Sequence, residues 1–172
     1  MNSANSRPLP RIRGAKLFTV VFLAVFLLSD SRAQQNPWAD YQRRTLQSVI
    51  DMHVDSTPQL DFLLSAHSFP SQVRLAYVGN TRPVTGKRLE LLRKWVKMTR
   101  HPESVVELFQ REVLFREGNK AHWLPVQKPL IEALKKEVKP GGAINAYVIF
   151  MGGAKFGHSW EWLFGMNEFD NR

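Results

Sequence analysis

An apolar run from Leu17 to Leu28 divides this chain into a segment that directs export and a segment that folds. Four cations precede the run: Arg7, Arg11, Arg13 and Lys16. Cations, then an apolar stretch, then small residues form the layout of a secretory signal peptide. The run is well short of the roughly 20 residues that a membrane-spanning helix needs. A cleaved signal is therefore expected, rather than a permanent anchor in the membrane.

The expected cleavage site lies between Ala33 and Gln34, because Ser31 and Ala33 supply the small side chains that signal peptidase requires. Residues 1–33 are then the signal peptide, and 34–172 form a single α+β domain. The signal contains five of the 24 Lys and Arg residues and one of the 15 Asp and Glu residues, so cleavage reduces the net charge from +9 to +5. We expect an exported protein, periplasmic or secreted, with no permanent membrane span and no nucleic-acid partner.

The chain has no cysteine. This excludes disulfides, thiolate metal sites, covalent haem and a thiol nucleophile. The five histidines lack the close helical spacing of a zinc protease, and Gly79 to Lys87 lacks the spacing of a phosphate-binding loop. Gly157–Glu161 is not the turn of a serine hydrolase, because a glutamate stands where that turn needs its second glycine. The sequence therefore predicts no metal, no cofactor and no recognisable catalytic residues.

Hydrophobic periodicity predicts three or four helices and about five strands. We expect helices over 37–53, 87–100 and 130–138, with a short one after Pro102, and strands over 73–78, 112–116, 121–126, 143–151 and 159–169. Gly79-Asn80 should end the first strand, and glycines should separate the last two. Because most connections are short, we predict a curved antiparallel sheet or a small, partly open β-barrel that carries the helices.

Two groups of residues are candidates for binding. Alternation places Trp160, Trp162 and Phe164 on one face of the last strand. Two interpretations stay open for the tryptophans of that strand: they belong to the core, or one of them lines a groove with Trp123, where flat rings suit sugars or side chains. The candidate binding residues are Arg82, His122, Trp123, His158, Trp160 and Glu161. The second group is a basic face on the helix 87–100, which would be a solvated surface or a contact with an anionic partner: Lys87, Arg93, Lys94, Lys97 and Arg100.

The leading functional hypothesis is an exported, soluble, non-catalytic module of the cell envelope that binds a ligand or partner through a groove on its sheet. The partner would be an anionic envelope component, a glycan or another envelope protein. One rival is a small extracytoplasmic hydrolase, whose histidine and carboxylate are brought together only by the fold. Another is a structural subunit of an envelope assembly, which an exposed apolar stretch within residues 54–71 would favour.

Overall fold

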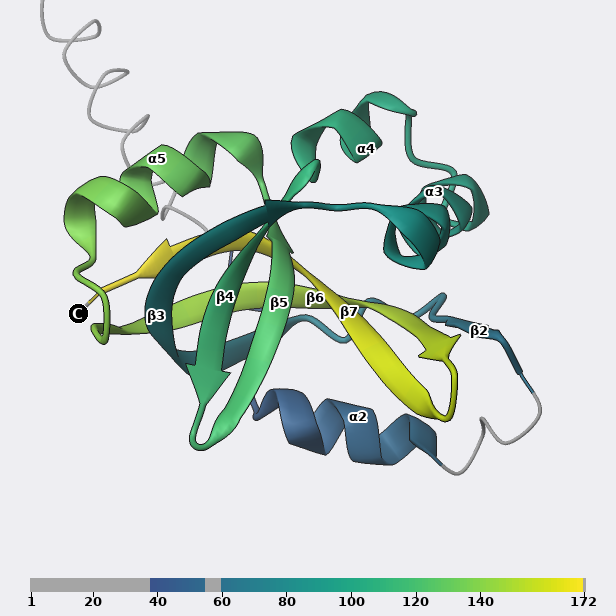
Figure 1. Ribbon diagram of the computed structural model, residues 1–172, viewed down its shortest axis with the longest axis horizontal. Helices are drawn as coiled ribbons and strands as arrows, with labels where there is room; N and C mark the ends of the chain where they lie inside the picture. The colour runs from purple at the N-terminus through teal and green to yellow at the C-terminus, as the bar shows by residue number, and fades with distance from the viewer. Residues whose placement is uncertain (1–37, 55–59, 172) are drawn as a thin grey trace, which may run out of the picture. The chain divides into compact units, whose positions relative to one another are not determined.

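The computed structural model describes residues 38–54 and 60–171 and shows four helices and a seven-stranded sheet (Figure 1). The helices are α2 (Leu46–Val54), α3 (Gly86–Met98), α4 (Ser104–Leu108) and α5 (Lys128–Glu137). The strands are β1 (Gln42–Arg43), β2 (Phe62–Leu64), β3 (Ser71–Pro83), β4 (Arg111–Glu117), β5 (Lys120–Val126), β6 (Ala143–Phe156) and β7 (Ser159–Asp170). The predicted mixture of helices and strands is confirmed, but the sheet is larger than predicted. The predicted signal peptide and its cleavage site, Ala33 and Gln34, lie outside the described residues.

Five strands of the sheet pair in a closed ring. The order of pairing is β3-β4-β5-β7-β6, and β6 pairs with β3 again. Most neighbours in the ring are antiparallel, whereas β5 and β7 are parallel. The short strands β1 and β2 extend the sheet beside β3 and β6. A sheet that returns to its first strand must curve strongly, and this curvature places the core inside the ring.

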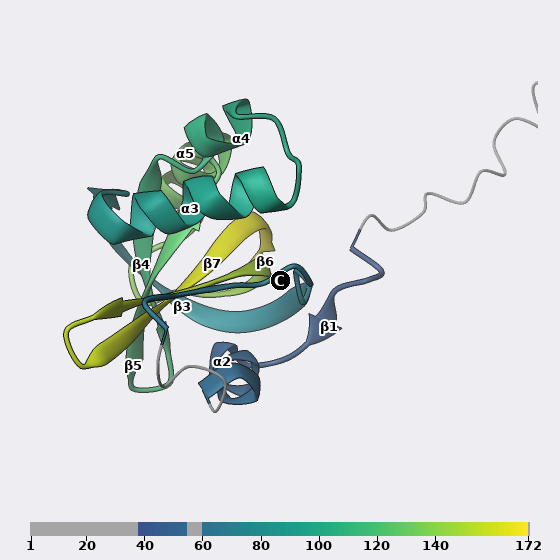
Figure 2. The same cartoon turned by 90° about the vertical axis from the view of Figure 1, so that its right-hand side faces the viewer.

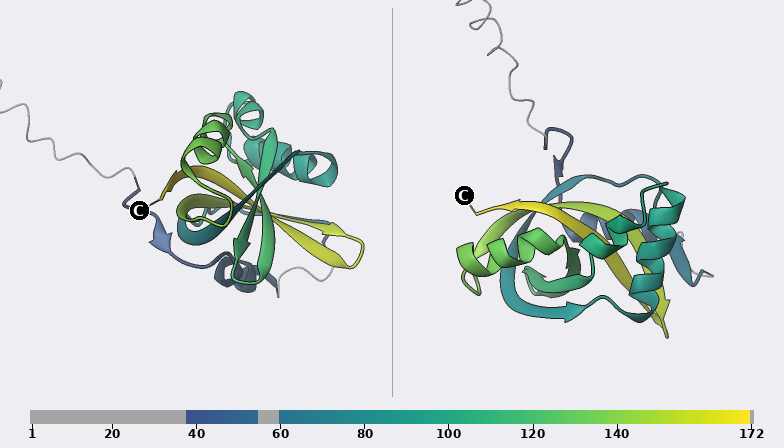
Figure 3. Two further views of the ribbon diagram at one scale, coloured as in Figure 1. Left: turned by 60° about the vertical axis from the view of Figure 1, so that its left-hand side comes forward. Right: turned by 90° about the horizontal axis from the view of Figure 1, so that it is seen from above.

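The ring is weakest between β5 and β7. A single residue pair, Val126 with Met166, joins these strands, and the Gln127 amide donates to the Met166 carbonyl at 3.3 Å. By contrast, β5 pairs with β4 along its whole length. The β4–β5 and β6–β7 hairpins diverge toward their turns in every view (Figures 1 and 3). Side chains, rather than backbone hydrogen bonds, must therefore close this part of the ring.

Two clusters of buried apolar side chains stabilise the domain. The larger cluster fills the ring with residues such as Phe115 and Phe150, and α2 and α5 pack on it from opposite sides (Figure 2). The smaller cluster lies beneath α3, where Leu92 and Trp95 meet Leu163 of β7. β7 thus contacts one core with Phe164 and the other with Leu163, as alternation of side chains along a strand requires.

The predicted helix over 37–53 is wrong in its first part. α2 begins only at Leu46, because Thr45 caps it: the Thr45 hydroxyl accepts from the Ser48 amide at 2.9 Å. The Glu117 carboxylate also accepts from the Leu46 and Gln47 amides, at 2.8 and 3.2 Å. Immediately before this cap, β1 pairs with β3. Helical spacing upstream of residue 45 was therefore a chance pattern, and the predicted start at Asn36-Pro37 lies outside the described residues.

Two predicted strand ends are also wrong. β3 continues beyond Gly79-Asn80 to Pro83, because Gly79 adopts a positive φ of 96° at a register shift and the strand resumes its pairing at Thr81. Such a bulge inserts extra residues without ending a strand. Gly152 and Gly153 lie within β6, and the tight connection to β7 is Gly157-His158. The first correction brings β3 to Arg82, which lines the pocket described below, and the second extends the pairing of β6 with β7.

Candidate ligand-binding pocket

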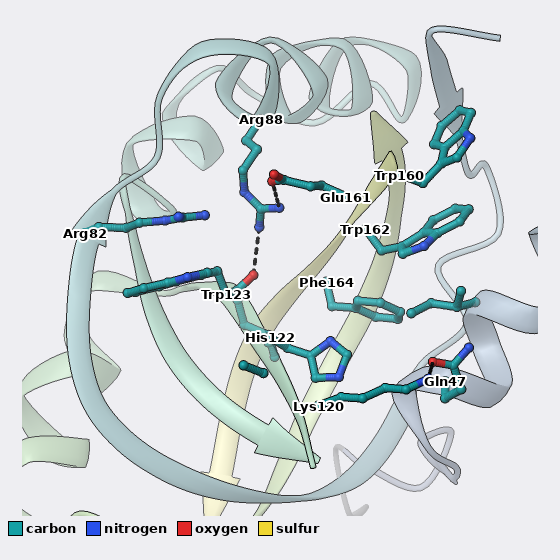
Figure 4. A pocket seen from close by; sticks show the side chains of 13 residues that line it. Gln47, Arg82, Arg88, Lys120, His122, Trp123, Trp160, Glu161, Trp162 and Phe164 are labelled. Atoms are coloured by element: carbon teal, nitrogen blue, oxygen red, sulfur yellow. Dashed lines mark hydrogen bonds and ion pairs between the residues drawn. The ribbon is translucent and has the colours of Figure 1, made fainter. Parts of the chain in front are cut away.

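A pocket of about 650 Å³ lies where β5 and β7 diverge (Figure 4). Its walls come from β3, α3, β5 and β7, and α2 closes its base. The lining side chains are mostly aromatic or charged: Gln47, Ile50, Arg82, Arg88, Lys120, Ala121, His122, Trp123, Leu124, Trp160, Glu161, Trp162 and Phe164. Segments far apart in the sequence thus contribute to one open cavity.

Arg88 of α3 joins the two diverging strands. Its Nη2 donates to the Trp123 carbonyl of β5 at 2.7 Å, and its Nη1 donates to Glu161 of β7 at 3.2 Å. The Arg88 side chain is only 8% exposed, so these contacts are shielded from water. A guanidinium presents several donors in a fixed plane, which suits it to bridging separate acceptors. Arg88 therefore substitutes for backbone pairing between β5 and β7.

Glu112 at the start of β4 holds two arginines in place. Its side chain is 1% exposed, and its two oxygens accept from Arg88 Nε and, at 2.7 Å, from Arg82 Nε. A buried carboxylate of this kind is stable only when it is paired and hydrogen-bonded. The Arg82 guanidinium then lies 4.3 Å from the centre of the Trp123 ring (Figure 4). Arg82 is 40% exposed, so it presents a positioned cation to the pocket.

The opposite wall is aromatic. The rings of Trp160 and Trp162 stack with centroids 5.4 Å apart and planes inclined by 19°. Gly153 of β6 pairs with Trp162 across the hairpin. A Cβ atom at Gly153 would lie 2.6 Å from Trp162 and 3.0 Å from Trp160. Glycine at this position therefore lets both indoles rest closely on β6, with Phe164 continuing the row toward the core (Figure 4).

The base of the pocket is polar. Lys120 Nζ donates to the Gln47 side chain at 2.5 Å. His122 lies beside it, and its Nε2 is buried without a hydrogen bond in the described part of the chain. Burial lowers the pKa of His122 below its ordinary 6.5; nearby Lys120 adds to this effect, and Glu117 opposes it. His122 is therefore neutral at neutral pH.

Acidification should destabilise the protein through His122. Because the pKa is about 6.5 in the unfolded chain and lower in the fold, the unfolded chain binds more protons just below pH 6.5, and stability falls as the pH drops through that window. Urea unfolding at a series of pH values measures this loss. His122→Gln should weaken the pH dependence of the free energy of unfolding. Identical pH profiles for wild type and His122→Gln would contradict a histidine held neutral.

Five of the six candidate binding residues predicted from the sequence line this pocket: Arg82, His122, Trp123, Trp160 and Glu161. His158 does not, because it lies exposed in the turn between β6 and β7. The strand assignments alone could not bring β5 beside β7, since their contact depends on how the ring closes. Whether these residues bind a ligand remains a prediction.

Sequence reasoning missed Arg88, Glu112 and Lys120, and it left Trp162 out of the binding set. A signal for Arg88 was present: it precedes Leu91, Leu92 and Trp95 by three, four and seven residues, which places it on the buried stripe of α3. A buried arginine implies a buried carboxylate. Nothing in the sequence distinguishes Glu112 from the other glutamates as that partner.

The basic face of α3 divides into two parts. Arg93, Lys94 and Lys97 of α3, together with Arg100, line a second pocket of about 550 Å³ between α3 and α4. The predicted helix over 87–100 is wrong at its end, because α3 stops at Met98 and Arg100 lies in the following turn with a positive φ of 57°. Lys94 forms an ion pair with Glu90 at 2.8 Å and lies 3.8 Å from the centre of the Phe62 ring. Lys87 is directed elsewhere, since its Nζ donates to the Lys155 carbonyl at 2.8 Å. Part of this charge is thus already used within the fold.

Residues 38–54 and 60–171 contain no group of three or more His, Asp or Glu side chains placed to bind a metal ion. No helix in this part of the chain has the length and apolar character needed to cross a bilayer. A scan against protein-family models matched none, and a search of curated proteins found no match. The geometry of the pocket is therefore the basis on which we infer a function.

Proposed function

We propose that the chain is an exported, soluble module of the cell envelope that binds a ligand in the pocket between β5 and β7 without catalysing a reaction. The observation that carries this proposal is the convergence of Trp123, Trp160 and Trp162 with positioned polar groups in one open cavity. Ligand sites commonly combine apolar or aromatic walls with a few polar groups that fix orientation. Two ligand classes suit this lining: a glycan, or an anionic component of the envelope.

We further propose that the five-stranded ring works as a small, partly open barrel whose opening is the binding pocket. The single backbone pair between β5 and β7 supports this, because the strands above it are free to diverge. Partly open barrels of five strands can bind oligosaccharides or oligonucleotides on their strand faces. This support comes from a likeness in architecture. The residues that line the pocket distinguish an oligosaccharide from an oligonucleotide.

The rival hydrolase has less support. It requires a histidine hydrogen-bonded to a carboxylate at the pocket, in reach of a substrate. Glu161 instead bonds Arg88, and neither His122 nor His158 forms a hydrogen bond to a carboxylate within the described ranges. The hypothesis of a structural subunit depends on the exposed side chains of Val54 and Leu60. These residues flank residues 55–59, which lie outside the described part of the chain.

Thermal melting against a panel of glycans, anionic headgroups and divalent metals tests the proposal. A ligand at 100 times its Kd adds about 2.7 kcal/mol, a shift of several degrees. We expect a glycan to stabilise the protein and Trp160→Ala to abolish that stabilisation. Trp38→Ala is the matched control, because Trp38 does not line this pocket. A glycan shift that survives Trp160→Ala would place the binding elsewhere, and a shift by metals alone would contradict the proposal.

A further inference from the structure

We infer that the ligand is an acidic glycan, whose carboxylate binds Arg82 at the Trp123 side of the pocket while a sugar hydroxyl binds Glu161. This inference rests on the proposed function and adds the ligand's charge and orientation. It follows from the donors and acceptors that the internal contacts of the pocket leave free.

Among the three cations that line the pocket, Arg82 has the most unused donors. Its guanidinium has five N–H groups, and the structure gives it one hydrogen bond, from Nε to Glu112. The plane is fixed by that bond and by Trp123 beneath it. A fixed guanidinium with free N–H groups matches the two oxygens of a carboxylate. Arg88, by contrast, already donates to Glu112, Glu161 and the Trp123 carbonyl, which makes it a structural residue.

The local charge at Arg82 favours an anion. Three cations lie around the pocket, Arg82, Arg88 and Lys120, and three carboxylates lie near them: Glu112, Glu161 and, beside Lys120, Glu117. Glu112 is buried and shared by two arginines, so the half-exposed Arg82 guanidinium keeps a positive charge that faces the pocket. Lys120 has only its Gln47 contact and keeps further N–H donors. A ligand anion on this side would be attracted without displacing an internal ion pair.

Glu161 determines which group of the ligand can bind at the β7 side of the pocket. Its side chain is 43% exposed, and one of its oxygens bonds Arg88. The remaining oxygen can accept from a hydroxyl. An acidic sugar offers a carboxylate and hydroxyl donors on the same ring, whereas a DNA strand offers phosphates and no hydroxyl along its length. The mixture of a free cation and a free carboxylate acceptor, next to the indoles of Trp160 and Trp162, therefore favours the glycan.

Calorimetric titration of the protein purified after export tests this inference with two matched probes. Oligogalacturonate carries a carboxylate on each sugar, and its methyl ester is the same chain without the charge. We expect the acid to bind at least tenfold more tightly than the ester. Arg82→Gln should remove that preference, and Arg82→Lys should retain part of it. Arg93→Gln, an arginine outside this pocket, should leave the preference unchanged.

The outcomes separate the inference from the proposed function. Equal binding of acid and ester, with both lost in Trp160→Ala, would overturn the acidic subsite but keep the glycan pocket. An acid preference that survives in folded Arg82→Gln would also overturn it. Tighter binding of a single-stranded oligothymidylate than of the acid would overturn the glycan assignment. If neither sugar probe binds, this inference is overturned. Thermal melting against the ligand panel then tests the proposed function independently.

Discussion

Glu112→Ala is expected to lower the free energy of unfolding by about 3–5 kcal/mol, the range for breaking a buried ion pair by removing one partner. The change leaves the buried Arg88 guanidinium without its main counter-charge, and Arg82 loses the bond that fixes it over Trp123. Urea unfolding followed by circular dichroism measures the loss. Arg88 also links β5 to β7, so the variant should lose stability and the shape of the pocket together.

Two further variants show whether the loss comes from the buried charge. The double change Glu112→Leu with Arg88→Met should recover much of the stability, because apolar residues of similar volume often replace a buried ion pair at little cost. Glu90→Ala removes an exposed partner of Lys94 and should cost less than about 1 kcal/mol. A cost for Glu112→Ala as small as that for Glu90→Ala would show that the network contributes little.

Gly153→Ala should weaken ligand binding by at least tenfold and destabilise the fold by about 1–3 kcal/mol, the usual cost of overpacking. The added Cβ would lie 2.6 Å from Trp162 and 3.0 Å from Trp160, so both indoles must move from their stacked positions. Titration with the glycan found in the melting panel measures the binding effect.

A double-mutant cycle shows whether Gly153 acts through the aromatic wall. If it does, the binding losses of Gly153→Ala and Trp160→Ala should not add, because both changes disrupt the same surface. Gly153→Ala combined with Arg82→Gln should be closer to additive, since Arg82 lies across the pocket on Trp123 (Figure 4). Full additivity with Trp160→Ala would contradict a shared wall.

Local patterns predicted the elements whose ends are marked by local chemistry. α3 has its apolar stripe through Leu91 and Trp95, and α5 ends just before Pro140-Gly141. The hairpin of β4 and β5 turns at Gly118-Asn119 as predicted. The predicted helix over 37–53 failed because two distant contacts, β1 with β3 and Glu117 with the start of α2, override its periodicity. Such contacts are not visible in local spacing.

The pocket shows the same limit. Alternation along β7 predicted that Trp160 and Trp162 share a face, and their stacked rings confirm it. The aromatic content also indicated a groove that includes Trp123, which lines the same pocket. Alternation could not show that Arg88 lies buried between β5 and β7, because that position depends on the closure of the ring. His158 was a candidate because it flanks the strand predicted over 159–169, whereas in the structure it lies exposed in the tight turn and does not line the pocket. Residue types were predictable, and the contacts between strands were not.

The most direct test of the pocket uses the indole N–H signals of the five tryptophans in a two-dimensional ¹H–¹⁵N NMR spectrum of the protein purified after export. Trp123, Trp160 and Trp162 line the pocket, whereas Trp95 lies on the buried face of α3 and Trp38 lies outside the pocket lining. Single Trp→Phe variants assign the signals. Saturation with an acidic glycan should shift the three pocket signals and leave Trp38 and Trp95 unchanged. Shifts confined to Trp38 or Trp95, or none at saturating glycan, would contradict a glycan-binding pocket between β5 and β7.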